Sequence, residues 1–153
     1  MFFISQIYHI LSISYIFQES SDKCYARLDV GFVLDSSGSL RNEYQKEKEF
    51  LKGIASTFDI SPDGTRAGVI TFSYFAVHSI RLSQHTDINS FKAAVDDIPL
   101  MGATTRIDRS LRLAQNELFS LNSGGRDDVP DVLILLTDGT QTPGEITIFN
   151  FDM

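Results

Sequence analysis

The sequence has few cysteines and few basic residues, which limits disulfides and the binding of nucleic acid or anionic lipid. Its 153 residues include a single cysteine, Cys24, so no disulfide can form within the chain. The 20 Asp and Glu outnumber the 13 Lys and Arg, which gives a net charge of −7. An acidic chain without a Lys/Arg block lacks the electrostatic footprint of a nucleic-acid-binding protein. It also lacks a polybasic segment for anionic lipid. We therefore expect no nucleic acid among its partners.

The N-terminal stretch is apolar, but it is too short and too polar to cross a membrane. Residues 1–17 are rich in apolar and aromatic side chains and are interrupted by serine, glutamine and histidine. We interpret residues 1–25 as an apolar leader. A secretory signal peptide fits by position and length, although no basic segment or clear cleavage site precedes Lys23. A leader that belongs to no folded domain is the alternative.

The length and the 42% hydrophobic fraction suit one globular domain. Apolar periodicity predicts strands and helices in the order strand, helix, two strands, two helices, strand. The strands are expected at residues 28–34, 67–72, 76–82 and 129–137, and the helices at 41–58, 88–98 and 107–121. The gap between the second and third strands permits a hairpin and excludes a helical crossover, so these two strands should be antiparallel. The fold class is therefore α/β, a Rossmann-like doubly wound sheet that is parallel except for one antiparallel edge strand.

Oxygen-bearing side chains follow two of the predicted strands. Asp35-Ser36-Ser37-Gly38-Ser39 comes directly after the first strand, and Asp138 comes directly after the last. Right-handed crossovers place the carboxyl ends of parallel strands at one edge of the sheet, where ligands bind. The predicted metal ligands at this edge are Asp35, Ser37, Ser39, Thr105 and Asp138. An all-oxygen set suits Mg²⁺, Mn²⁺ or Ca²⁺ rather than Zn²⁺ or Cu²⁺. Ser39 is also placed to cap the following helix.

Three motifs in this order resemble a von Willebrand factor A domain with a metal-ion-dependent adhesion site. They are Asp-x-Ser-x-Ser after a central strand, then Gly-Ala-Thr-Thr-Arg-Ile-Asp, then Leu-Leu-Thr-Asp-Gly. The resemblance places Asp35, Ser37 and Ser39 in the first metal loop, Thr105 in the second and Asp138 in the third. It implies that the hydroxyls coordinate directly and that some carboxylates act through water. It is closest to extracellular matrix and collagen-type members and makes residues 26–153 a partial domain of this family.

The chain departs from the family pattern after the third metal loop, where complete domains continue with further helices and strands. Only residues 139–153 follow here, so we expect a C-terminally truncated domain with an incomplete sheet. The strand at residues 129–137 should then lie on the sheet edge, which is an aggregation hazard. Residues 146–151 have strand character and offer a cover for it. Matrix-type members often pair a cysteine placed like Cys24 with a second one after the last helix, and this chain has no second cysteine.

Three functions compete, and a fourth possibility is that the truncated chain has no function of its own. The leading one is a divalent-metal-dependent adhesion module of a secreted extracellular protein, which is not an enzyme. Its partner, a matrix or cell-surface protein such as collagen, would complete the metal coordination with a carboxylate. The alternative is an intracellular scaffold domain in a cytoplasmic multiprotein assembly.

The third function is a Mg²⁺-dependent phosphoryl-transfer enzyme with Asp35 as nucleophile. It is disfavoured because position 37 is serine rather than a second aspartate. The chain also has no Gly-x-x-x-x-Gly-Lys loop, and no histidine lies in the three metal loops.

Overall fold

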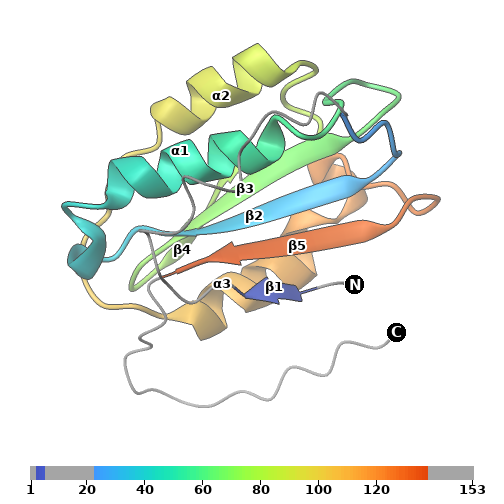
Figure 1. Cartoon of the computed structure of the whole chain (residues 1–153). Coiled ribbons are helices and arrows are strands. Elements are labelled where there is room, and N and C mark those ends of the chain that lie inside the picture. Colours follow the sequence, from blue (N-terminus) through green and yellow to red (C-terminus); the bar gives the residue numbers. More distant parts are fainter. Residues whose placement is uncertain (1–2, 6–22, 138–153) are drawn as a thin grey trace.

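The computed structural model describes residues 3–5 and 23–137, whose strands form a five-stranded sheet with helices on both faces (Figure 1). The sheet order is β1-β5-β2-β3-β4. The strands are β1 (Phe3–Ser5), β2 (Asp29–Asp35), β3 (Arg66–Phe72), β4 (Ala76–Ile80) and β5 (Asp131–Leu136). The helices are η2 (Gly38–Leu40), α1 (Tyr44–Ala55), α2 (Ile88–Asp96), α3 (Ile107–Leu113), the π-helical η3 (Ala114–Leu118) and η4 (Leu121–Ser123).

The predicted fold class is confirmed. β2 lies between β5 and β3 and pairs with both in parallel. β4 pairs with β3 in the antiparallel sense, as the short gap between them requires. Asp35, the last residue of β2, is the register partner of Phe72, the last residue of β3. The two neighbouring strands therefore end at the same height, where the first predicted metal loop begins.

Alternate residues of the central strand fill two apolar layers, one on each face of the sheet. Val30, Phe32 and Leu34 pack with α1 and α2, which include the buried Leu51 and Phe91. Val33 packs on the opposite face with side chains of β3, β5 and η3. β2 is thus buried on both sides along its whole length, and the metal loop that follows it starts from a fixed strand end.

The helix predicted at residues 107–121 is interrupted by the π-helical η3. Its Leu118 lies over a pair of glycines, Gly31 and Gly68, which are register partners on β2 and β3. A Cβ at Gly31 would come within 2.4 Å of Leu118 Cδ2, and a Cβ at Gly68 within 2.9 Å of Leu118 Cδ1. The glycine pair therefore forms the notch into which this turn of helix packs.

β5 is not on the sheet edge, and that prediction is wrong. β1 runs parallel to it, with Phe3 beside Leu133 and Ser5 beside Leu135. These three residues lie within the predicted leader. Residues 146–151, proposed above as a cover for the edge, are outside the described residues.

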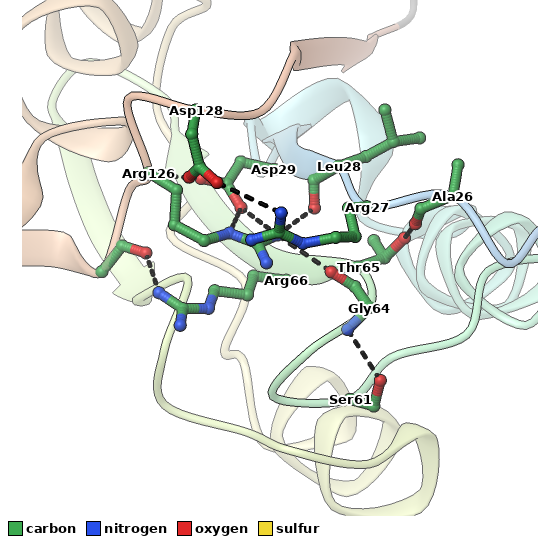
Figure 2. Close-up of polar contacts among 11 residues, drawn as sticks. Ala26, Arg27, Leu28, Asp29, Ser61, Gly64, Thr65, Arg66, Arg126 and Asp128 are labelled. Carbon is green, nitrogen blue, oxygen red and sulfur yellow. Dashed lines mark hydrogen bonds and ion pairs between the residues drawn. The ribbon is translucent and has the colours of Figure 1, made fainter.

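A buried ion pair joins the amino ends of the strands, opposite the predicted metal loops (Figure 2). Asp29 is fully buried at the start of β2, and its Oδ1 accepts from Arg126 Nε at 2.9 Å and Nη2 at 2.7 Å. Its Oδ2 accepts from the Arg126 backbone N–H at 2.7 Å. Nη2 also donates to the carbonyls of Leu28 and Gly64, each at 2.9 Å. One guanidinium therefore holds together the loop before β5, the start of β2 and the turn before β3.

Asp131 stands beside Asp29 in the parallel register of β2 and β5. Its pKa is raised from 3.8 to about 6, first by burial and then by the charges of Asp29 and Asp127. Because the folded-state pKa is above the unfolded value, folding favours the protonated carboxyl. The stability that Asp131 contributes below pH 4 is lost as the pH rises through about 6.

We expect Asp131→Asn to raise the free energy of unfolding by about 1 kcal/mol at pH 7.5 and to leave it nearly unchanged at pH 4. The full pKa shift would correspond to more, but solvent screens this partly exposed group. Urea unfolding at the two pH values measures the difference. Asp63→Asn, in an exposed turn, is the matched control. A gain that is independent of pH would contradict the account.

Candidate metal centre

Asp35, at the carboxyl end of β2, is buried, and hydrogen bonds orient its carboxylate. The side chain is 0% exposed. Its Oδ1 accepts from the Ser37 backbone N–H at 2.8 Å, and its Oδ2 accepts from Thr137 Oγ1 at 2.7 Å. Thr137 immediately follows β5, so the hydrogen bond ties the ends of two neighbouring strands together. One carboxylate oxygen is thereby oriented by the loop that follows β2, and the other by the residue that follows β5.

The hydroxyls of Ser37 and Ser39, in the loop that follows Asp35, lie within hydrogen-bonding distance of each other. Their Oγ atoms are 3.0 Å apart. The short η2 turn brings them together, because it curls the chain between them. Ser37 is buried and Ser39 is exposed, so the pair runs from the protein interior to the solvent.

The structure corrects the predicted role of Ser39 as a helix cap. α1 begins only at Tyr44 and has Glu43 at its N-cap position, because the η2 turn and residues 41–43 intervene. Ser39 lies within η2, and its hydroxyl contacts Ser37 rather than the helix backbone. This leaves Ser39 in the predicted metal loop.

Ser36 joins the second metal loop to the first. Its buried Oγ accepts from the Met101 N–H at 2.7 Å, and its carbonyl accepts from the Gly102 N–H at 2.9 Å. The Gly38 N–H donates to the Ala103 carbonyl at 2.9 Å. Gly102 and Ala103 both have positive φ, 74° and 69°, a conformation that is uncommon for alanine. The chain thus turns sharply beside the first loop just before it reaches Thr105.

Thr105 is 5% exposed and lies where this loop enters α3. The next residue, Arg106, donates its backbone N–H to the Ser73 carbonyl at 2.9 Å. Its guanidinium makes two 2.7 Å contacts with the Asp108 carboxylate. These hydrogen bonds lower the pKa of Asp108. The nearby Asp108 carboxylate is therefore held by arginine, outside the predicted ligand set.

The described residues therefore bring Asp35, Ser37 and Ser39 together and set the Thr105 loop against them. Asp138, the fifth predicted ligand, lies outside the described residues, and the complete ligand set stays a prediction. The donors fit a hard cation, because all are carboxylate or hydroxyl oxygens. Within residues 3–5 and 23–137, no cluster of three or more His, Cys, Asp or Glu side chains offers a different metal site.

Sequence reasoning missed two residues of the site, Ser36 and Thr137. Neither belongs to the predicted ligands, and each positions them. Thr137 could have been suggested by its place between the last apolar strand and Asp138. Ser36 gives no such signal, because its partners are backbone groups more than 60 residues away in the chain.

We expect Thr137→Val to lower the free energy of unfolding by about 1–3 kcal/mol, because the near-isosteric change leaves a buried Asp35 oxygen without its hydroxyl donor. Chemical denaturation measures the loss. Thr57→Val, which removes an exposed hydroxyl, is the control and should cost much less. Equal stability of Thr137→Val and the unaltered chain would show that the hydroxyl does not hold Asp35.

Comparison with protein families gives one match that covers most of the chain. Residues 29–148 match the family model of the von Willebrand factor type A domain.

The chain is similar in sequence to segments of much larger proteins and spans about a quarter of their length or less. The chain is 28% identical to vitrin from Bos taurus over 76% of its own length and 18% of vitrin's. It is 30% identical to the collagen alpha-4(VI) chain of Mus musculus, covering 82% of this chain and 5% of the collagen chain. It is 33% identical to matrilin-3 of Gallus gallus over 73% of this chain and 26% of matrilin-3.

Solved structures share the fold. Proximal thread matrix protein 1 from the mussel byssus superposes with a TM-score of 0.76 at 26% identity, over 82% of this chain and 34% of that one. A second structure of that protein, with a TM-score of 0.75 at 24% identity, is described as having a zinc-occupied MIDAS motif. In the part of the chain that the structure describes, no helix is both long and apolar enough to span a membrane.

Proposed function

The chain belongs to the von Willebrand factor type A domain family, and we propose that it is a divalent-metal-dependent protein-binding module. The observation that carries the proposal is the oxygen cluster at the end of β2. Two serine hydroxyls lie 3.0 Å apart next to a carboxylate that is already fixed by the Ser37 N–H and Thr137. Such an arrangement presents two hydroxyl oxygens for a cation beside a carboxylate that is already oriented.

Ser37, Ser39 and Thr105 would hold the ion through their hydroxyls, while Asp35 and Asp138 supply negative charge. Mg²⁺ is the proposed ion, with Mn²⁺ and Ca²⁺ as alternatives, because hard cations prefer oxygen. The metal site described for the mussel thread protein supports divalent metal binding at this type of site, without fixing which ion binds here. When bound, the cation provides an open position for a carboxylate oxygen of the partner. The exposed Ser39 marks the side from which that carboxylate would arrive.

We propose binding rather than catalysis. A nucleophilic Asp35 would have to meet its substrate, but the side chain is fully buried and both oxygens accept hydrogen bonds, from the Ser37 N–H and from Thr137. Loss of these buried hydrogen bonds during a reaction would be costly. Relatives in this comparison include collagen chains and matrilin, which agrees with a structural role.

We further propose that the module acts outside the cell and that its partner is a matrix or cell-surface protein, with collagen as a candidate. The support is the similarity to a collagen alpha-4(VI) chain and to a thread matrix protein. The net charge of −7 gives no general attraction to an acidic partner, so a carboxylate would be drawn by the bound cation itself.

Isothermal titration of the purified chain with Mg²⁺ and Mn²⁺ tests the proposal. We expect one saturable site, and Ser37→Ala should weaken the binding at least tenfold, since loss of groups around a metal typically costs about 10–100-fold. Ser120→Ala, which removes a hydroxyl bonded only to nearby helix-end groups, is the control. Absence of saturable binding, or equal affinities in Ser37→Ala and the control, would refute the proposal.

A further inference from the structure

The hairpin between β3 and β4 carries an exposed pair of aromatic rings. Tyr74 is 43% exposed and Phe75 is 62% exposed. The rings meet edge to face, with centroids 4.8 Å apart. The Ser73 N–H donates to the Phe75 carbonyl at 2.9 Å and closes the turn beneath them. Exposed aromatic side chains in contact with each other on a fixed turn are typical of interaction surfaces.

The guanidinium of Arg109, in α3, makes cation–π contacts with both rings. Its guanidinium carbon lies 4.3 Å from the Tyr74 ring centroid and 5.6 Å from that of Phe75. Nη1 also donates to the Tyr74 carbonyl at 2.7 Å. Within the described residues no carboxylate forms an ion pair with Arg109, whereas neighbouring Arg106 is paired with Asp108. Tyr74, Phe75 and Arg109, here called the aromatic tip, thus combine apolar surface with a positioned positive charge.

The aromatic tip is continuous with the candidate metal centre. β3 ends at Phe72, the register partner of Asp35, and the Phe72 carbonyl accepts from the Ser36 N–H at 2.7 Å. The Ser73 carbonyl accepts from the Arg106 N–H, next to Thr105. The tip and the metal loops therefore share one edge of the sheet and are joined by backbone hydrogen bonds.

We propose that the aromatic tip is a second contact for the same ligand as the metal. The occupant is a polypeptide segment of a partner protein that carries one carboxylate for the metal, a second for Arg109, and an apolar side chain that packs on Phe75. The inference rests on the proposed function.

Charge complementarity favours this occupant over a purely apolar one. The chain as a whole is acidic, but at physiological salt the charges beyond about 8 Å are largely screened. An acidic segment that reaches this edge meets Arg109 and the bound cation at short range. Arginine and aromatic side chains also dominate the binding energy of protein interfaces.

The test uses a phage-displayed random peptide library, selected on the immobilised full chain with saturating Mn²⁺ and eluted by chelation. We expect the selected peptides to contain an acidic residue for the metal, a second acidic residue and an apolar residue. Synthetic copies should bind Phe75→Ser and Arg109→Gln about tenfold more weakly at saturating Mn²⁺. Leu121→Ser and Arg81→Gln, at exposed positions away from this edge, are the matched controls, and circular dichroism checks that each variant folds.

The outcomes separate the two proposals. Mn²⁺-dependent peptides that bind all variants equally well would overturn the aromatic tip and leave the metal-dependent function standing. A chain that neither binds Mn²⁺ nor retains peptides would overturn both. Metal-independent binding to phosphatidylcholine and phosphatidylserine vesicles that is lost in Phe75→Ser would also overturn the inference, because the tip would then be a lipid contact.

Discussion

The candidate site depends on one buried carboxylate and the two hydrogen bonds that hold it. Asp35 ends the central strand inside the protein, where an unpaired carboxylate would be costly. The Ser37 N–H and the Thr137 hydroxyl supply its partners and connect the loop after β2 to the end of β5. This fixed carboxylate also fixes the start of the loop, so Ser37 and Ser39 are presented at one place. A metal-binding role follows from that placement more than from any single residue type.

The two ends of the parallel strands have different physical characters. At the amino ends, Arg126 and Asp29 form a buried ion pair that also satisfies two backbone carbonyls. Removing one partner of such a pair is strongly destabilising, so this edge acts as a rigid base. At the carboxyl ends, the exposed Ser39, a sharply turned loop and an exposed aromatic hairpin face the solvent. Binding residues on loops above a rigid sheet are the usual arrangement in α/β domains.

The sequence was sufficient for the fold class because apolar periodicity marks β2, β3, β4 and β5 to within two residues. The family suggested by the three motifs, with its similarity to collagen-type members, is also confirmed. Long-range packing could not be read in the same way. The pairing of β1 with β5 and the π-helical turn over Gly31 and Gly68 depend on tertiary contacts that leave no periodic signal.

The site was predictable only in part for the same reason. Hydroxyls after a strand indicate ligands, but the supporting hydrogen bonds of Ser36 and Thr137 join segments far apart in the chain. Asp138 lies outside the described residues and stays a prediction.

The central claim is that Asp35 and its hydrogen bonds organise Ser37 and Ser39 to hold a divalent cation. Crystals of the chain soaked with Mn²⁺ test it most directly, through anomalous diffraction at the manganese edge. The account predicts a single strong anomalous peak between the two serines. The peak should lie about 2.1 Å from the Oγ atom of each, a distance usual for a small hard cation. A peak beside Asp29 and Asp131 at the amino ends of the strands, or no peak beside the two serines, would contradict it.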